Sequence, residues 1–219
     1  MNTGQKVKNF TALSSNGQID FPKNNGLWTV LYIYEGDFLP TSATDIKELD
    51  RAYPKFLAHD TQIIAMSTDS VASHLAWILS LRNQNKDGLP IKIELISDRL
   101  GEIMGEFGVA IQNESGTFII DPEGILRAKN IHSSVTGINV TEIERELLAL
   151  QTARYQFGQT PSGWTPGEDI LDHPPRSLSS TLTNMSDKQA LGGYCLDWYL
   201  CYRQDTGLRT QSSTSLPTE

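Results

Sequence analysis

The stretch TFIIDPEGILR, residues 117–127, is the part of the sequence that most directly indicates a fold. Its first four residues are apolar or β-branched, which is typical of a buried strand. Asp-Pro-Glu-Gly at 121–124 is a turn signal, and the apolar pattern resumes at Ile125. The stretch therefore predicts two antiparallel strands joined by a tight turn.

Two further apolar runs and three helix-like stretches accompany this hairpin. Residues 27–34 and 62–66 are rich in apolar and β-branched side chains, so each predicts a buried central strand. Apolar residues at helical spacing predict helices over 44–57, 70–81 and 141–151. Strands that alternate with helices predict an α/β sheet with helices on both faces, to which the hairpin adds an antiparallel edge.

Bulk properties exclude several classes of partner. The chain has 219 residues and a formal net charge of −8 at pH 7, with a pI near 5.0. Nucleic acids and anionic membranes need a basic face, so we expect neither as a partner. The first ten residues lack an apolar signal core, and no run of about 18 apolar residues occurs. We therefore expect a soluble, cytoplasmic protein.

The composition changes after residue 150, where proline, glycine and serine replace the periodic apolar pattern. We expect a core over residues 1–155 and an extended arm over 156–205. Residues 194–202 are aromatic and leucine-rich, so this segment must dock on another surface, for which a partner subunit is the natural choice. Residues 206–219 have almost no apolar content and predict a disordered tail.

Several segments in the same chain order resemble the peroxiredoxins: STDS at 67–70, ISD at 96–98, TFIIDPEGILR, and SGWTPGED at 162–169. The run CLDWYLC, residues 195–201, resembles the Cys-x-Asp-Trp-x-x-Cys element in the arm of long-armed bacterial and archaeal members. The resemblance implies a thioredoxin-like α/β fold with a C-terminal dimerisation arm. It further implies a homodimer or a ring of dimers, a thioredoxin-like reductant as partner, and no cofactor or metal.

The same resemblance places the peroxide-attacking cysteine of that family at Ser42. It puts the proline and threonine of the surrounding motif at Glu35 and Leu39. The two active-site arginines, which lower the thiol pKa and polarise the peroxide, fall at Ser115 and Ile138. None of the expected residue types stands at these positions.

Such a site is chemically impaired. A hydroxyl is a weak nucleophile and cannot form the sulfenic acid on which peroxide reduction depends. A carboxylate at Glu35 would raise the pKa of a nearby thiol, and Leu39 removes a hydroxyl donor. A single introduced serine could not explain all the replacements together. We therefore predict a degenerate peroxidatic site, loss of peroxidase activity, and a role in assembly or redox sensing.

Ser42 also has other interpretations. With Thr41 and Thr44 it precedes a predicted helix that has Asp45 in its first turn, a pattern typical of helix capping. A hydrolase would use Ser42 as nucleophile, but no GxSxG elbow is present. Nothing in the sequence brings a particular histidine near it; the four are His59, His74, His132 and His173.

His74 lies beside Trp77 on a predicted helix, so packing or hydrogen bonding is a better interpretation than metal ligation. In the long-armed relatives the second arm cysteine resolves the sulfenic acid of the partner subunit, and the first can exchange with it. In this chain those residues are Cys201 and Cys195, and their expected target is Ser42.

Two interpretations of Cys195 and Cys201 remain. They could form a redox-active dithiol/disulfide pair if the arm bends enough to bring their Cα atoms within about 4.4–6.8 Å. They could instead be small buried apolar residues beside Trp198 and Tyr199. The six-residue spacing favours packing, because no straight helix or strand bridges it. An alternative function is an active thiol-dependent peroxide reductase, in which Cys195 or Cys201 of the neighbouring subunit supplies the nucleophile.

Overall fold

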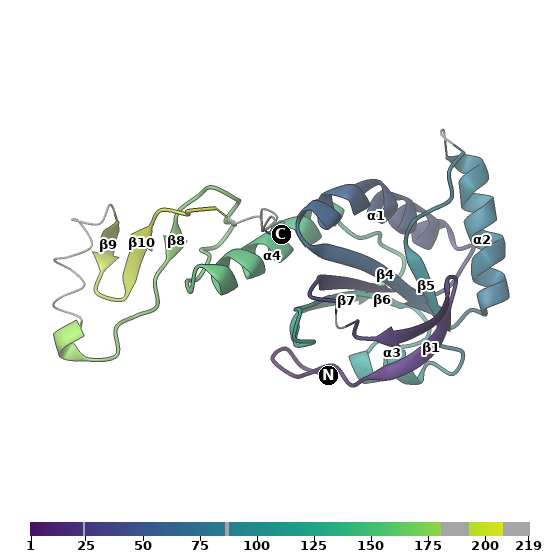
Figure 1. The fold of residues 1–219 in the computed structure, drawn as a ribbon, viewed down its shortest axis with the longest axis horizontal. Coiled ribbons are helices and arrows are strands. Elements are labelled where there is room, and N and C mark those ends of the chain that lie inside the picture. The colour runs from purple at the N-terminus through teal and green to yellow at the C-terminus, as the bar shows by residue number, and fades with distance from the viewer. Residues whose placement is uncertain (24, 86–87, 181–192, 208–219) are drawn as a thin grey trace, which may run out of the picture. The chain divides into compact units, whose positions relative to one another are not determined.

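A computed structural model describes residues 1–23, 25–85, 88–180 and 193–207 of the chain (Figure 1). Contacts divide it into two compact units, Met1–Val140 and a second that begins at Thr141. Each unit is described by itself. From residue 208 onward the predicted tail lies outside the described residues. The boundary near residue 155 and the arm over 156–205 remain predictions.

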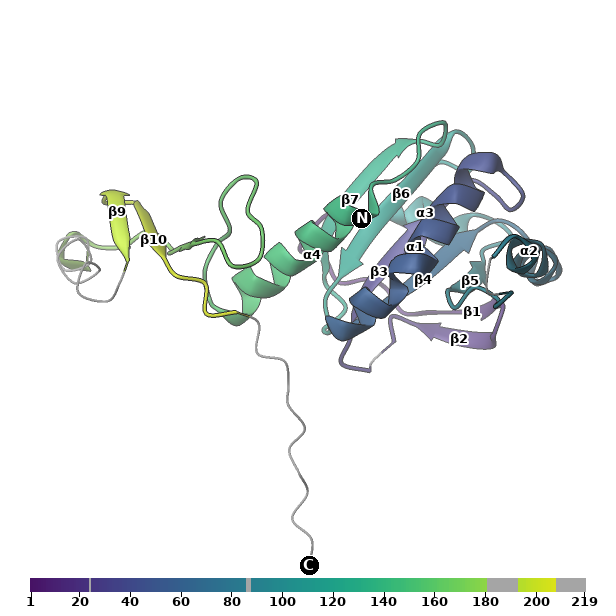
Figure 2. The same ribbon diagram turned by 90° about the horizontal axis from the view of Figure 1, so that it is seen from above.

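The first unit is built on a seven-stranded mixed sheet. The strands are β1 (Phe10–Ser14), β2 (Gly17–Phe21), β3 (Trp28–Ile33), β4 (Thr61–Ser67), β5 (Glu94–Ser97), β6 (Glu114–Ile120) and β7 (Leu126–Ser133). Their order across the sheet is β2-β1-β5-β4-β3-β6-β7. Figure 2 shows β1 and β2 together at one edge and β6 and β7 at the other.

The predicted central strands and the hairpin are confirmed. β3 pairs in parallel with β4, and β4 pairs in parallel with β5. β6 runs antiparallel to both β3 and β7, so the 117–127 stretch forms the antiparallel edge. Asp121 closes the turn because its carboxylate accepts the backbone N–H of Glu123 at 3.0 Å and that of Ile125 at 2.9 Å.

Alternating side chains of β3 supply both faces of the core. Leu31 and Ile33 belong to an apolar cluster that includes Met104 and Phe107. Tyr32, which points to the opposite face because strand side chains alternate, hydrogen-bonds to a residue of the first helix. All residues of β3 are buried, as expected for a strand covered on both faces.

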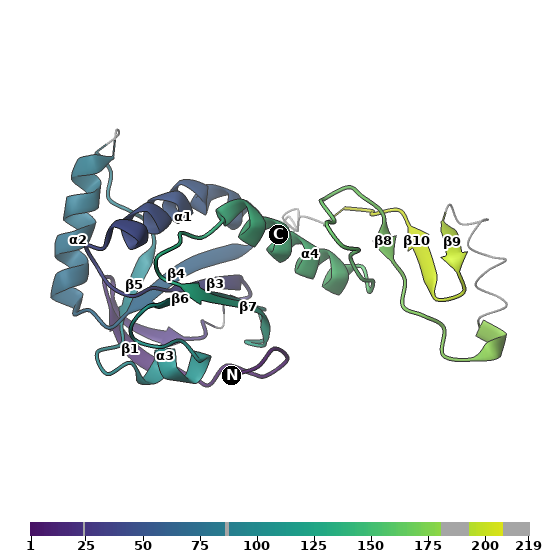
Figure 3. The ribbon, with the colours of Figure 1, turned by 180° about the vertical axis from the view of Figure 1, so that it is seen from behind.

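Three helices complete this unit: α1 (Pro40–Ala58), α2 (Val71–Gln84) and α3 (Glu102–Phe107). Figures 1 and 3 show α1 and α3 on opposite sides of the sheet. The first two match the helices predicted over 44–57 and 70–81, but α1 begins four residues earlier, at Pro40. The fixed φ of proline suits the first position of a helix, where no N–H is needed.

Helix α4 (Val140–Tyr155) matches the helix predicted over 141–151 and belongs to the second unit from Thr141 onward. The second unit also contains a three-stranded antiparallel sheet. Its strands are β8 (Ile170–Leu171), β9 (Tyr194–Asp197) and β10 (Leu200–Arg203), in the order β8-β10-β9. A small apolar cluster of Leu148, Ala149, Trp164 and Ile170 gives this unit a core of its own. None of the helices in the described part of the chain combines the length and apolar character that a membrane span requires.

Candidate functional site

Ser42 is buried in the first turn of α1, with 4 % of its surface exposed. The helix is capped by Leu39, which makes no side-chain capping hydrogen bond, and Ser42 is its third residue. The prediction that Ser42 caps the helix is therefore wrong. The reason is that Pro40 starts the helix early and carries Ser42 into the first turn.

Asp45 lies one turn after Ser42, on the same face of α1. Its buried carboxylate accepts hydrogen bonds from the Tyr32 hydroxyl at 2.6 Å and from the backbone N–H of Ile138 at 3.2 Å. Burial raises the pKa of Asp45, and these two hydrogen bonds and the charge of His132 partly offset the rise. Burial, and then the neighbouring Asp45, raise the pKa of Tyr32 far above its ordinary value. The residues around Ser42 therefore hold a proton on Tyr32 and offer an acceptor at Asp45.

Gly137 lets the chain pass close to this carboxylate. A Cβ atom at Gly137 would lie 2.8 Å from Asp45 Oδ1, closer than real Cβ atoms approach other heavy atoms. The close approach allows the N–H of the next residue, Ile138, to reach Asp45. At the position where the family resemblance expects a guanidinium, the chain thus presents a backbone donor to a carboxylate.

The structure separates the predicted pocket residues into two groups. Ser115 is buried in β6 near enough to Tyr32 to lower the pKa of its hydroxyl, so it joins Ile138 at the Tyr32–Asp45 pair. Glu35 is held elsewhere, because its carboxylate accepts hydrogen bonds from Ser134 Oγ at 2.5 Å and Asn113 N at 3.3 Å.

Leu39 lies at the start of α1 and is 37 % exposed. Sequence reasoning missed Tyr32 and Gly137, and it treated Asp45 only as a first-turn acid. The i, i+3 spacing of Ser42 and Asp45 is the signal that could have placed Asp45 beside the predicted pocket.

A second buried polar group surrounds His74. Its Nδ1 lies 2.9 Å from Asp37 Oδ2 and its Nε2 lies 3.2 Å from the Ile96 carbonyl oxygen. Both neighbours are acceptors, so a ring N–H at Nδ1 can donate to the Asp37 carboxylate and one at Nε2 can donate to the carbonyl. The Tyr34 hydroxyl donates to the same carboxylate at 2.8 Å. The predicted packing and hydrogen-bonding role of His74 is therefore confirmed.

No hydrogen bond joins Ser42 to a histidine within the described ranges, so the hydrolase interpretation gains no geometric support. His132 lies in β7, where its Nδ1 is 3.1 Å from the Ser133 carbonyl oxygen. Likewise, among residues with described positions, no three side chains of the metal-ligating types come together.

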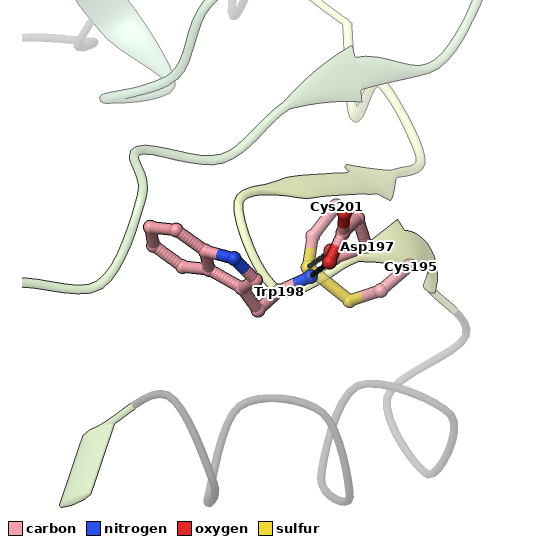
Figure 4. Close-up of a disulfide and its surroundings, with 4 residues drawn as sticks. All are labelled: Cys195, Asp197, Trp198 and Cys201. Atoms are coloured by element: carbon pink, nitrogen blue, oxygen red, sulfur yellow. Dashed lines mark hydrogen bonds between the residues drawn. A yellow bond between two sulfur atoms is a disulfide. The ribbon is translucent and has the colours of Figure 1, made fainter. Parts of the chain in front are cut away.

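Cys195 and Cys201 stand directly opposite each other in the β9–β10 hairpin and are joined by a disulfide (Figure 4). Their Cα atoms are 4.0 Å apart. The interpretation of the two cysteines as unbonded packing residues is wrong, because the chain reverses between Asp197 and Leu200. At this turn the Asp197 carboxylate accepts the N–H of Trp198 at 2.7 Å.

The two faces of strand β9 differ, since successive side chains point to opposite sides. Cys195 and Asp197 share one face. Tyr194 and Leu196 share the other, with 48 % and 69 % of their surfaces exposed. Tyr194 stacks on Tyr202 of β10 with ring centroids 4.9 Å apart. The hairpin thus separates a disulfide face from an apolar face.

The mixed sheet with α1 and α3 on its two sides is that of a thioredoxin-fold protein. The site at Ser42 lies in the first helix after the central strand, and the second unit adds the disulfide hairpin. The sequence model of the AhpC/TSA family matches residues 3–129. The chain belongs to this family, the peroxiredoxins.

Relatives match along almost the whole chain. The peroxiredoxin of Methanosarcina mazei is 33 % identical over 214 residues, covering 93 % of this chain and 97 % of the relative. Peroxiredoxin 2 of Caldanaerobacter subterraneus is 32 % identical over 207 residues, covering 92 % of each chain.

Solved structures share the fold. A yeast mitochondrial 1-Cys peroxiredoxin, studied for thiol resolution through glutathione and thioredoxin systems, superposes with a TM-score of 0.81 at 21 % identity, covering 93 % of this chain and 99 % of its own. A cysteine-to-serine mutant of the peroxiredoxin 6 of Arenicola marina gives a TM-score of 0.80 at 24 % identity, covering 94 % and 98 %.

Proposed function

We propose that this protein is a peroxiredoxin-family member that does not reduce peroxides at its ancestral site and whose redox chemistry resides in Cys195 and Cys201. The observation that carries the proposal is the disulfide between these cysteines, in a chain whose ancestral position holds a buried serine. The pair would act as a redox sensor, and the unit that carries it would serve assembly.

The surroundings of Ser42 support the loss of peroxide reduction. A peroxidatic thiol needs a positive field that favours the thiolate. Asp45, one turn away, offers a carboxylate instead, and its hydrogen bonds come from Tyr32 and a backbone N–H rather than from arginine. The Glu35 carboxylate accepts hydrogen bonds from Ser134 and Asn113, so Glu35 supplies no positive charge to the surroundings of Ser42.

The hairpin supports reversible oxidation of the cysteine pair. The β9–β10 ladder holds Cys195 opposite Cys201, and the backbone N–H of Asp172 donates to the Cys201 carbonyl at 3.0 Å. These backbone contacts do not involve the sulfur atoms, so the dithiol needs little chain movement to close. In a reducing cytoplasm, where thiols dominate, the disulfide would then report oxidation.

The apolar face of the hairpin supports a homodimer. Tyr194 and Leu196 have 48 % and 69 % of their surfaces exposed in their unit, and aromatic residues such as Tyr194 are enriched in protein interfaces. Both lie on the face of β9 opposite Cys195, so a partner subunit could cover them and leave the disulfide face open.

The competing function is peroxide reduction by the cysteine pair itself. One thiolate would attack the peroxide to give a sulfenic acid and an alcohol, and the second thiol would displace water to close the disulfide. The disulfide across the hairpin is compatible with this chemistry as well.

Peroxide consumption with a dithiol reductant separates the two functions. We expect the protein and its Cys195→Ser, Cys201→Ser double variant to consume peroxide at the same background rate. Cysteine-dependent turnover would establish the competing function. In parallel, the reduced protein should lose two hydrogens on titration with a thiol/disulfide buffer, and the double variant should not; a pair that stays reduced throughout would remove the proposed sensor.

A further inference from the structure

We infer that reduction of this disulfide begins at Cys195, which accepts an external thiolate, while Cys201 is the sulfur released. The inference rests on the proposed redox role of the pair. It assigns different roles to two cysteines that the hairpin places opposite each other.

The positions of the two strands make the sulfurs unequal. In the described three-stranded sheet, β10 lies in the middle and pairs with both β8 and β9, whereas β9 lies at the edge. Cys201 on the middle strand is buried, with 5 % of its surface exposed, and Cys195 on the edge strand is only partly buried. A thiolate must approach in line with the S–S bond, so access decides which sulfur it attacks.

The surroundings of Cys201 suit a released thiol rather than an attacked sulfur. Its Sγ lies 3.7 Å from the Asp197 carbonyl oxygen. Once Cys201 has been released and protonated, its S–H can donate a weak hydrogen bond to the same oxygen.

The reaction balances in two exchanges. The reductant's thiolate bonds to Cys195 Sγ, the Cys195–Cys201 bond breaks, and its electron pair leaves on Cys201, which takes a proton from water. A second thiol of the reductant then attacks the reductant's own sulfur in the mixed disulfide. This step releases Cys195 as a thiolate, which is protonated in turn, and leaves the reductant as a disulfide.

Asp197 narrows the class of reductant. It lies two residues after Cys195 on the same face of β9, and it is exposed. Its carboxylate repels small anionic thiols, and the repulsion is screened by salt. The geometry therefore favours a dithiol reductant that does not concentrate negative charge beside its sulfur, such as a small dithiol-containing protein.

Trapping of the mixed disulfide tests the assignment. The oxidised full-length protein is mixed with a thioredoxin whose second active-site cysteine is replaced by serine, quenched in acid within seconds, alkylated and mapped by mass spectrometry. We expect the thioredoxin on Cys195 and the alkyl group on Cys201, in roughly tenfold excess over the reverse. Leu196→Ala, on the opposite face, serves as a matched control and should leave the ratio unchanged.

A majority of adducts on Cys201, or equal amounts on both, would overturn the inference. So would the absence of any adduct from protein whose disulfide a phosphine reduces completely. Failure of the proposed function is distinguishable, because the intact mass would then show no disulfide before the trap is added. Asp197→Asn should accelerate reduction by glutathione several-fold and reduction by dithiothreitol less, because the attacking dithiothreitol carries only the charge of its thiolate whereas glutathione also carries carboxylates. Equal effects on both would refute the reductant class.

Discussion

The Tyr32 hydroxyl donates a hydrogen bond to the Asp45 carboxylate at 2.6 Å, linking the central strand of the sheet to the first turns of α1. The pair lies beside buried Ser42 and also engages the backbone of Ile138. A site that would need a cation for peroxide chemistry is therefore organised around a carboxylate.

Ser42→Cys, made in the Cys195→Ser, Cys201→Ser background, should not restore peroxide reduction. Burial and the Asp45 carboxylate both raise the thiol pKa, so we expect it at or above about 8.5, the value of a free cysteine, despite the helix N-terminus. The pH dependence of alkylation by iodoacetamide measures this pKa. If the introduced thiol instead titrates near neutral pH and the variant turns peroxide over rapidly, the site lacks only the cysteine and the prediction of a degenerate site is wrong.

Asp45→Ala should destabilise the first unit by about 1–3 kcal/mol, because it leaves the buried Tyr32 hydroxyl and the Ile138 N–H without their acceptor. Urea unfolding measures the loss. Tyr32→Phe should lower the free energy of unfolding by less in the Asp45→Ala variant than in the unmodified protein. Strictly additive effects of the two substitutions on the free energy of unfolding would contradict a stabilising hydrogen bond between Tyr32 and Asp45.

Stability should depend on pH through Asp45. Burial raises its pKa in the folded state above the ordinary 3.8. The folded protein therefore holds a proton that the unfolded chain has already lost, and stability falls as pH rises from 3.8 through the raised folded-state pKa. Asp45→Asn should remove this slope from unfolding measured across the acidic range. An unchanged slope would show that Asp45 titrates as it does in the unfolded chain.

Gly137→Ala should destabilise the protein by roughly 1–3 kcal/mol, since the added Cβ would meet Asp45 Oδ1 at 2.8 Å. Gly105→Ala is a matched control. Gly105 lies in α3 with nothing within 4 Å of an added Cβ, so this change should be neutral or stabilise by about 0.5–1 kcal/mol. Equal effects of the two substitutions would argue against the close approach at Gly137.

His74→Ala should destabilise the first unit by about 1–3 kcal/mol, because it leaves the buried Asp37 carboxylate without its hydrogen-bond partner on the ring. Replacing Asp37 by Asn in addition should recover part of the loss. The exposed His173 is the control, and its substitution by alanine should change the unfolding midpoint little. A small cost at His74 would show that the hydrogen bonds of the ring contribute little beyond its packing.

The sequence predicted the elements whose signals are local. The 117–127 hairpin, the two central strands and three of the helices have clear apolar periods or turn residues. The short strands β1, β2 and β5 and the six-residue α3 carry too few residues for a periodic signal. The β9–β10 hairpin was missed because the six-residue spacing of the two cysteines was compared only with a straight helix or a straight strand, and not with a chain that reverses direction between them.

The site was harder to predict, because its contacts join distant parts of the chain. The hydrogen bonds of Glu35 reach residues 78 and 99 positions away, and that between Asp45 and Ile138 spans 93. Alignment with a family assigns a residue to a position but does not say which neighbour its side chain will bind. Ser42 was expected to precede the first helix and lies inside its first turn, and the role of Asp45 required the folded structure.

The tight passage of Gly137 over Asp45 also bears on how this protein could change further. If the site near Ser42 is degenerate as proposed, substitutions toward the residues expected of the family would have to be combined rather than made one at a time. A sulfur at position 42 alone would lie beside the Asp45 carboxylate, and removal of the carboxylate alone would leave the Tyr32 hydroxyl and the Ile138 N–H without their acceptor. Under the proposed function, either substitution made first would therefore carry a cost that only the other would offset.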